Sequence, residues 1–514
     1  MYNQIKRNNI EKDRPMSQRK TGVTLSYLSI ILANLIGLVY TPFLLRMMGQ
    51  SEYGLYALAA SIISYLSVID FGFGNATIRY TALYRGKGEE KKLPGLWGML
   101  FTLYGFISLI SLAAGIFFSF HSDILFSKSM TVEELMRIRI LLLLMTFNIA
   151  VSFPLSVFES IMIAYERFKF QRGLQVMRTL LQPIIMIPLL LLGYKSIALV
   201  VLITILNISY LSANLWYCLR KIRIQIKFQR FNIPLFKEIM QYSFWVFLIM
   251  VVDRLYWSSG QIILGTFVGT SAVAVFAVAL QFKNYLSSFS TAISSVFLPK
   301  ITTVNSTSEL DYLFIKIGRI QFIIIAFILS GFILFGKTFI ILWAGHDYSD
   351  AYLIALIILI PLAVPLIQTL GMSILQAQNK LKFRSYTYLL MAIVCCLTSI
   401  PLAKLYGGLG CAISISFSLI LCNILIMNIY YYKAIHLNIP KFWREIVTMS
   451  LPILIIDGIV YLIVEQITIA QTWGYFLLQV IVFSILYLFV IYKWGINRYE
   501  KSILSNVLPK FIKH

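Results

Sequence analysis

Residues 22–45 read GVTLSYLSIILANLIGLVYTPFLL and contain no charged side chain. An α-helix of this length would be about 36 Å long, and the hydrocarbon core of a bilayer is about 30 Å thick. The apolar core of a secretory signal is only about 7–15 residues long and ends at a small-residue cleavage site, which is absent here. We therefore interpret the run, which follows a basic leader, as an uncleaved first transmembrane helix.

The whole chain has the composition of this first run. It has 514 residues, of which 59% are apolar and 13% charged, and its mean hydropathy is +0.81. Soluble domains carry about 45–50% apolar and about 25% charged residues. The net charge of +23 could indicate a nucleic-acid partner, but the basic residues lie between apolar runs. Membrane topology explains that pattern more simply, so we predict an all-α polytopic membrane protein and no nucleic-acid binding.

Fourteen segments are long and apolar enough to cross a bilayer. They span residues 22–45, 55–78, 94–119, 138–164, 175–192, 196–218, 239–264, 271–298, 314–342, 351–377, 386–403, 409–432, 446–465 and 473–492. An even number of crossings places both termini on the same side of the membrane.

The basic residues indicate which side that is. Of the 44 Lys and Arg residues, 35 fall in the leader, the tail and the loops on the side of the termini, and 7 fall on the other side. Basic loops remain cytoplasmic. We therefore predict cytoplasmic N- and C-termini. The remaining two basic residues, Arg254 and Lys283, fall within spans.

A weak internal repeat suggests two related halves. Residues 44–59 (LLRMMGQSEYGLYALA) resemble residues 264–279 (LGTFVGTSAVAVFAVA) when Gly49 is aligned with Gly269, an offset of 269 − 49 = 220. AYERFKF at 164–170 resembles AQNKLKF at 377–383 at an offset of 213, which Pro188 and Pro401 share. Six is an even number, so two six-helix halves would form a parallel repeat, as in some transporters.

These patterns predict the following organisation, given by residue ranges. It comprises a cytoplasmic basic leader (1–20), an N-terminal half (21–220), a cytoplasmic linker (221–238), a C-terminal half (239–432), an appended helix pair (433–492) and a cytoplasmic tail (493–514).

Cysteine, histidine and nucleotide motifs predict no metal or cofactor. The five cysteines lie in apolar runs and the four histidines are scattered, so neither group has zinc-site spacing. Residues 331–338 (GFILFGKT) fit the phosphate-loop pattern letter for letter, but they lie in or at the outer end of a predicted membrane helix. A phosphate loop needs a preceding strand and a following helix, so we interpret the match as chance.

Three short motifs and the order of the predicted helices resemble those of a known family. Pro42-Phe-Leu-Leu-Arg46 leads to Gly49 and Tyr53-Gly54, Asp70-Phe-Gly-Phe-Gly74 lies in the second helix, and Gln376-Ala-Gln-Asn379 ends the tenth. With the 6 + 6 + 2 helix plan, these features resemble the polysaccharide (O-antigen-type) flippases of the multidrug/oligosaccharidyl-lipid/polysaccharide exporter superfamily. The resemblance implies a protein of the bacterial inner membrane that moves undecaprenyl-pyrophosphate-linked oligosaccharides for surface polysaccharide assembly.

Charged residues deep in a span mark candidate sites, because each costs roughly 2.5–3.5 kcal/mol on insertion scales. At about 1.5 Å per residue, Asp70, Lys283 and Arg254 lie about 22, 18 and 15 Å from the outer helix ends. We predict that Arg254 and Lys283 attract the pyrophosphate of the carrier, and that Asp70 or Asp253 balances their charge or titrates during transport. The alternative is a structural ion pair without substrate contact.

Four further residues are weaker candidates. Asp253 points about 100° away from Arg254 on its helix, so we favour Arg254 for the cavity. Arg79 is an inner gate or, more simply, a positive-inside anchor. Glu159 and Asp457 could bind a coupling cation, H⁺ or Na⁺.

The leading hypothesis is a non-enzymatic flippase that works by alternating access. Its partners would be the lipid-linked oligosaccharide, membrane lipids and the polymerase and glycosyltransferases of the same pathway. The alternatives are a lipid II-type flippase and a cation-coupled drug antiporter of the same superfamily. A membrane glycosyltransferase or polymerase fits less well, because the predicted loops are short.

Overall fold

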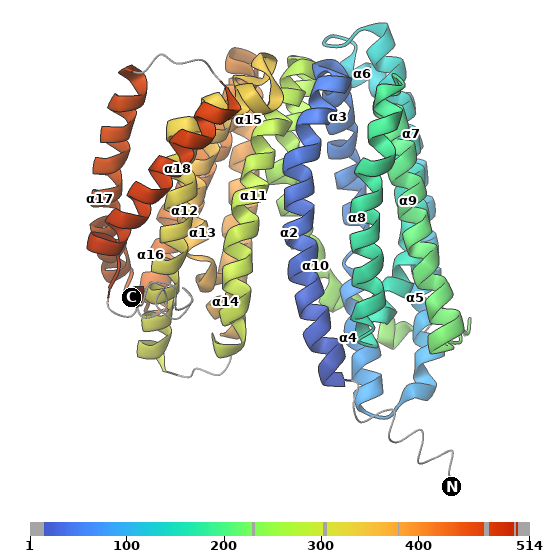
Figure 1. Ribbon diagram of the computed structural model, residues 1–514. Coiled ribbons are helices and arrows are strands. Elements are labelled where there is room, and N and C mark those ends of the chain that lie inside the picture. The colour runs from blue at the N-terminus through green and yellow to red at the C-terminus, as the bar shows by residue number, and fades with distance from the viewer. Residues whose placement is uncertain are drawn as a thin grey trace. The chain divides into compact units, whose positions relative to one another are not determined.

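The computed structural model describes residues 15–228, 232–301, 306–378, 380–466, 472–497 and 500–501. In these ranges the chain is helical and contains no strand. It divides into two compact units, Met1–Ala274 and Val275–His514. Figure 1 shows the helices of both units.

The first unit contains the helices up to α10. They are α2 (Pro15–Met48), α3 (Gln50–Leu66), the short helix η1 (Ser67–Asp70), α4 (Phe73–Gly86), α5 (Leu93–Phe120), α6 (Ser122–Phe126), α7 (Val132–Ala164), α8 (Phe168–Leu191), α9 (Ser196–Tyr217) and α10 (Ile233–Phe267). Here α5 and α9 pack on α7, α2 packs on α8, and α10 packs on α3 and α4.

The second unit contains nearly all of α11 and everything after it. Its helices are α11 (Thr270–Ile301), α12 (Thr307–Ala344), α13 (Ala351–Ile367), α14 (Thr369–Ala377), α15 (Leu381–Leu419), the π-helical segment η5 (Ile420–Ile426), α16 (Met427–Ala434), α17 (Ile439–Gln466) and α18 (Trp473–Val490). Here α12 packs on α13, α17 and α18, and α13 packs on α15.

Aromatic and aliphatic side chains fill the interior of each unit. Tyr104, Phe158 and Trp97 are buried in a cluster between α4, α5 and α7, and Phe483 and Tyr487 are buried against α12 in the second unit. Large apolar side chains also lie exposed in rows along the helices, for example Leu454 and Leu462 on α17. A soluble protein would not expose such rows, whereas a bilayer solvates them.

Within the described ranges, thirteen helical segments are long and apolar enough to cross a membrane. The prediction of a polytopic all-α membrane protein is thus confirmed. One of these segments, Lys382–Ala434, has 53 residues and would be about 80 Å long as a straight helix, too long for one crossing. It leaves helical geometry at Gly407, between the predicted spans 386–403 and 409–432. The break at Gly407 supports fourteen crossings, which remain a prediction.

The structure corrects several predicted boundaries. The expected continuous helix at 55–78 is interrupted after Asp70, and the one at 351–377 is split at Gln368 into α13 and α14. The fourth span begins at Val132 rather than at 138, because Thr131 and Glu134 form a capping box at its start. Residues 120–137, which the predicted spans leave as a loop, therefore contain α6 and the first turns of α7.

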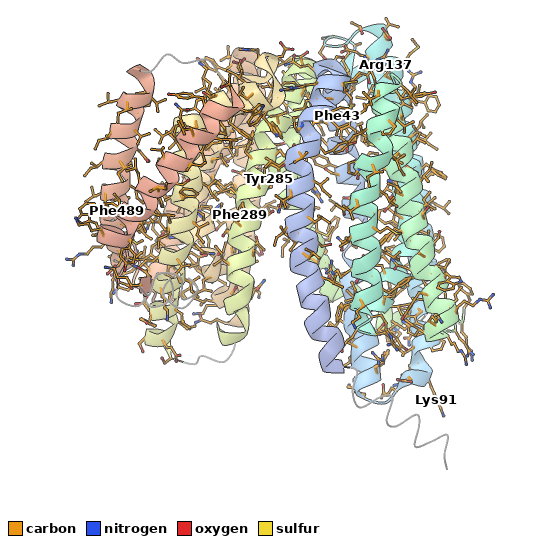
Figure 2. The ribbon with its side chains drawn as sticks, viewed as in Figure 1. Phe43, Lys91, Arg137, Tyr285, Phe289 and Phe489 are labelled. Atoms are coloured by element: carbon orange, nitrogen blue, oxygen red, sulfur yellow. The ribbon has the colours of Figure 1, made fainter. Side chains whose placement is uncertain are left out.

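The ends of the first unit are chemically distinct. Figure 2 labels Arg137 near one end of this unit and Lys91 at the other. At the Arg137 end, Arg137 pairs with both Glu52 and Glu133, and Ser196 donates to Glu52. Glu52 is buried, whereas its charge partner Arg137 is partly exposed, and these contacts tie α3, α7 and α9 together.

Candidate functional site

The helix break after Asp70 lies at the centre of a 37-residue span, Gln50–Gly86. Asp70 is 70 − 50 = 20 residues from its start and 86 − 70 = 16 from its end. The break places Phe71 and Gly72 at φ values of +53° and +70°. Backbone that leaves helical geometry at this depth needs partners from the protein or from a cavity, because lipid offers none.

The break is held by α10. A Cβ added to Gly72 would lie 2.6 Å from Cγ1 of Val246, so only glycine fits this contact. The ring of Phe71 stacks on Phe247 at 4.4 Å. The broken helix is therefore a built feature of the first unit.

Asp70 itself is half-buried and incompletely satisfied. The Tyr104 hydroxyl on α5 is a hydrogen-bonding neighbour of both Asp70 and Ser156 of α7. The Oδ1 atom of Asp70 is buried without a hydrogen-bond partner. A buried carboxylate oxygen without a hydrogen-bond donor favours the binding of a proton, a cation or a water molecule.

Arg254 lies beside a serine-lined contact between α3 and α10. One turn along α10, the Ser258 carbonyl accepts a hydrogen bond from Ser61 at 3.1 Å, and Ser64 donates to the Ser258 hydroxyl at 3.2 Å. Arg254 is half-buried, and the described residues give it no hydrogen bond or ion pair. Its neighbour Asp253 is exposed, in keeping with the predicted difference in direction.

The other predicted cations have different surroundings. Arg79 is exposed on α4, and its guanidinium lies 5.8 Å from the ring centre of Tyr80. Lys283 is half-buried on α11 in the second unit, where its ammonium donates to Asn284 at 3.3 Å. Arg254 and Lys283 each lie 13 residues from the turn that joins α10 to α11, counted from Phe267 and Thr270. Each is thus near mid-span, as predicted.

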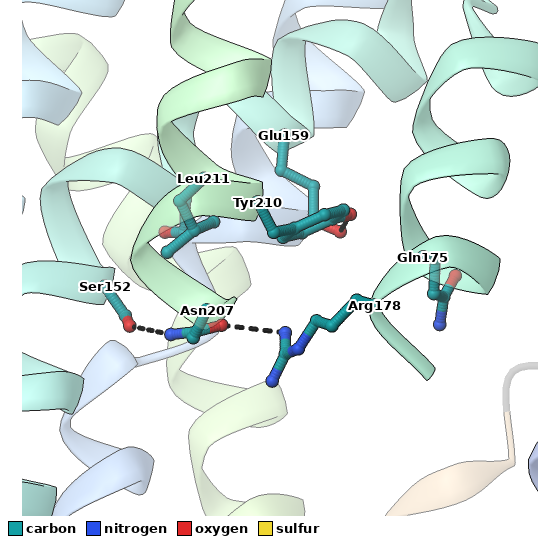
Figure 3. Close-up of a pocket in the computed structure, with 8 residues that line it drawn as sticks. Ser152, Glu159, Gln175, Arg178, Asn207, Tyr210 and Leu211 are labelled. Atoms are coloured by element: carbon teal, nitrogen blue, oxygen red, sulfur yellow. Dashed lines mark hydrogen bonds between the residues drawn. The ribbon is translucent and has the colours of Figure 1, made fainter. Parts of the chain in front are cut away.

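Of the site residues predicted from the sequence, Glu159 is the one that lines a described cavity. Figure 3 shows this cavity, whose volume is about 230 Å³, between α7, α8 and α9. Its lining residues are Ser152, Ser156, Glu159, Gln175, Arg178, Asn207, Tyr210 and Leu211. Ser156 links it to the Asp70 region, because the same side chain neighbours Tyr104.

Hydrogen bonds orient the charged groups of this cavity. Arg178 donates to Asn207 at 2.8 Å, and Asn207 donates to Ser152 at 2.7 Å, as the dashed lines in Figure 3 mark. Tyr210 donates to Oε1 of Glu159 at 2.8 Å, and Gln171 donates to the same atom at 3.0 Å. The described residues form no ion pair between Arg178 and Glu159. The cavity therefore offers a cation, an acid and several hydroxyl and amide groups at once.

Sequence reasoning missed Arg178. It lies ten residues into α8, yet it also belongs to the basic stretch 167–178, where it counted as a loop charge. The sequence allows one helix to begin at Phe168 and end at Leu191. In that helix Arg178 lies about 15 Å from the start, which would have marked it as a charge within a span.

Asp457 takes part in a contact between two helices of the second unit. Ser330 of α12 donates to its Oδ2 at 2.5 Å, so the pair joins α12 to α17. It is not among the residues that line the cavities described here. Among the described residues, no three His, Cys, Asp or Glu side chains gather closely enough to hold a metal ion.

Comparison with known structures places the fold. The chain resembles the lipid II flippase MurJ in an inward closed conformation, with a TM-score of 0.71 and 18% identity over 91% of this chain and 97% of that one. It also resembles the MATE transporter VcmN of Vibrio cholerae, with a TM-score of 0.55 and 16% identity over 82% and 98%. The fold is thus that of multi-pass membrane exporters and flippases.

The sequence comparison then gives the family. The pattern of the polysaccharide biosynthesis protein family matches residues 20–305, more than half of the chain, so this chain belongs to that family. The family resemblance inferred from the motifs is confirmed. The chain is also 20% identical over 334 residues to the uncharacterized membrane protein EpsK of Bacillus subtilis (strain 168). That match spans 62% of this chain and 64% of EpsK.

Proposed function

We propose that this protein is a flippase that moves lipid-linked oligosaccharides, carried on undecaprenyl pyrophosphate, from the cytoplasmic to the outer leaflet of the bacterial inner membrane. The observation that carries the proposal is a match to a polysaccharide biosynthesis family in a chain with the fold of a lipid II flippase. An O-antigen or capsule repeat unit is the substrate class that fits best.

In this proposal Arg254 and Lys283 attract the pyrophosphate. The support for Arg254 is its position near mid-span, half-buried and without a protein partner among the described residues. A guanidinium can donate two parallel hydrogen bonds to a phosphate, and a low-dielectric setting strengthens them. Arg79 would act at the cytoplasmic mouth, where the head group enters.

The acidic residues would couple transport to a cation. Glu159 is the best candidate for an H⁺ or Na⁺ site, because Oε1 carries both of its hydrogen bonds and Oε2 is left for a ligand. Asp70 is the second candidate, with its unsatisfied Oδ1. Asp457 is the third, because its Oδ1 is likewise buried without a hydrogen-bond partner, and Asp253 would at most adjust the local charge.

The proposal includes alternating access by two six-helix halves, cytoplasmic termini and no enzymatic step. The polymerase and glycosyltransferases that use the same carrier are the expected partners. Equivalent turns support the repeat: Gly49 and Gly269, which the sequence aligns, both have positive φ, at +80° and +124°.

The test is to delete the gene and measure surface polysaccharide together with lipid-linked intermediates. We expect loss of the glycan, with complete repeat units trapped on the cytoplasmic leaflet. Arg254→Ala and Lys283→Ala should restore the glycan poorly, whereas Lys91→Ala, which removes an exposed charge near a helix end, should restore it fully. Unchanged glycan in the Arg254 and Lys283 variants would refute the charge mechanism.

A lipid II-type flippase is the second candidate, favoured by the high structural likeness to MurJ. Trapped lipid II in place of oligosaccharide intermediates would select it. A drug antiporter would instead give normal glycan and new drug sensitivity.

A further inference from the structure

A second polar cavity lies within the second unit. Its volume is about 200 Å³, and it is lined from α11, α13, α14, α15, η5 and α16. Thr291, Thr369, Tyr388 and Asn423 supply hydroxyl and amide groups, and Arg384 supplies the charge. No carboxylate is among its lining residues.

Several lining positions of the two cavities correspond along the repeat. Ser156 and Thr369 differ by 369 − 156 = 213, and so do Glu159 and Met372, at 372 − 159 = 213. This is the offset of the second sequence match. Arg384 corresponds to position 384 − 213 = 171, which is Gln171.

The residues at corresponding positions differ in charge between the two cavities. In the first unit Gln171 donates to Glu159. In the second unit an arginine replaces the amide, and the apolar Met372 replaces the acid. The first cavity carries both signs of charge, whereas the second carries a positive charge alone. A purely cationic cavity selects an anion.

Arg384 is held with one donor unused. Its Nη2 donates to the Tyr388 hydroxyl at 3.0 Å, and that hydroxyl donates to Asn423 at 3.0 Å. The guanidinium lies 4.6 Å from the Tyr388 ring centre. Its Nη1 is buried without a hydrogen-bond partner, and the described residues give it no ion pair. A buried donor in this state lacks an acceptor.

The cavity lies near the start of α15 and the end of α16. Arg384 is three residues after the start of α15 at Leu381, and Tyr431 is three residues before the end of α16 at Ala434. Phe383 stacks on Tyr430 at 4.1 Å beside it. Aromatic and basic side chains gather at this level of a membrane protein.

An apolar strip runs along the face of α15 opposite the one that carries Arg384 and Tyr388. Tyr386, Leu390, Ile393 and Leu397 recur at helical spacing, and all are exposed. A bilayer would solvate this exposed face, whereas the cavity lies on the buried side of α15.

We propose that this cavity binds the phosphate group of a lipid, with Arg384 as its charged ligand and the cavity hydroxyls as further donors. The phosphate belongs either to a bulk anionic phospholipid or to a polyprenyl carrier, since both present the same group. Binding is expected without any glycan or transport, so the inference stands apart from the proposed flippase activity.

The test uses the purified full-length protein in phosphatidylcholine nanodiscs. Phosphatidylglycerol is added in one arm and undecaprenyl phosphate in the other, and bound lipid is measured by native mass spectrometry. A charge-assisted contact of this kind corresponds to about a ten- to a hundredfold change in affinity. We expect Arg384→Gln to lower affinity by that factor for at least one of the two lipids.

The matched control is Lys382→Gln, which removes an exposed positive charge from the same turn of α15. It should change affinity less than about threefold, because an exposed charge is screened. Equal losses in both variants, or full binding by Arg384→Gln, would overturn the proposal. The arm that shows the Arg384-dependent loss identifies the lipid.

Folding is controlled with a second substitution. Tyr388→Phe keeps the ring next to Arg384 but removes the hydroxyl that fixes the guanidinium. If Arg384→Gln fails to fold, Tyr388→Phe should still lower lipid affinity several-fold. Wild-type affinity in Tyr388→Phe would then count against the site.

Discussion

At the scale of single residues, buried arginines decide how the helices are tied together. Arg319 of α12 donates to both carboxylate oxygens of Glu500, at 2.7 and 2.9 Å, and to Glu445 of α17 at 2.6 Å. Arg319 and Glu500 are both buried. Breaking such a pair leaves a charge without compensation, and this costs more than the pair itself contributes.

We predict that Arg319→Met destabilises the protein by about 3–5 kcal/mol, because Glu500 then stays buried without a compensating positive charge. The double variant Arg319→Met/Glu500→Gln should unfold at a higher temperature than Arg319→Met alone, since the unpaired charge is gone. Thermal unfolding in detergent measures both. A double variant less stable than the single one would show that the charge pair is not what matters at this position.

The same residues show what sequence reasoning could and could not find. Mid-span position was enough to single out Arg254 and Lys283, because a charge far from both helix ends is conspicuous. Glu159 lies near the end of α7 and was only a weaker candidate. Arg178, Arg319 and Arg384 lie within about ten residues of a basic loop and were absorbed into the count of cytoplasmic charges. That count explains topology well, but it treats every basic residue near a helix end as an anchor.

A second residue-scale prediction concerns Glu159. Replacing it with Gln keeps the size of the side chain and its bond from Tyr210, but removes the negative charge from the cavity. If Glu159 binds a coupling cation, glycan export by Glu159→Gln should fall at least tenfold and lose its dependence on the ion gradient. Glu90→Gln, exposed outside the cavity, is the control and should export normally. Equal export by both variants would remove Glu159 from the coupling role.

At the scale of elements, the break between η1 and α4 could not be predicted in detail. The triplet Asp70-Phe71-Gly72 suggested only a resemblance, and apolar content made 55–78 look continuous. The break depends on a tertiary contact, the fit of Gly72 against Val246. Hydropathy measures length and composition but carries no information about such a contact.

We predict that Gly72→Ala impairs both folding and export. The new methyl group would clash with Val246, and alanine would be held at a positive φ, so the free energy of unfolding should fall by about 1–3 kcal/mol. Gly86→Ala is the matched control, since its Cβ would meet nothing within 4 Å and its φ is not positive. Detergent stability and complementation of a deletion strain measure the two effects. If both substitutions behave alike, the break is not a constraint on this protein.

The segment Lys382–Ala434 gives a second prediction at this scale. If Gly407 separates two crossings, a cysteine at Lys404 should react with a membrane-impermeant maleimide in intact cells, and one at Lys433 should react only after the membrane is opened. Both positions are exposed, so access to the reagent and not burial decides the result. Reaction from the same side at both positions would contradict fourteen crossings.

At the scale of the whole molecule, composition and charge were the strongest predictors. They correctly gave a multi-pass helical membrane protein, because the cost of exposing backbone to lipid leaves few other solutions. The repeat needed more than composition. Its sequence matches were short, but the cavity positions that differ by 213 residues add support from within each unit.

Alternating access makes a final prediction about the two units. Each has its own buried clusters, so each should move as a body while the distance between them changes. Spin labels at Lys91 and Lys221 report on the first unit alone, and labels at Lys382 and Lys441 on the second; all four positions are exposed. We expect both of these distance distributions to stay constant when lipid-linked oligosaccharide is added, and the Lys91–Lys382 distribution to shift. Arg254→Ala should abolish the shift, because the substrate can drive the change only through contacts that differ between the two states. A shift within either unit, or none between them, would argue against rigid-body motion of these two units as the transport step.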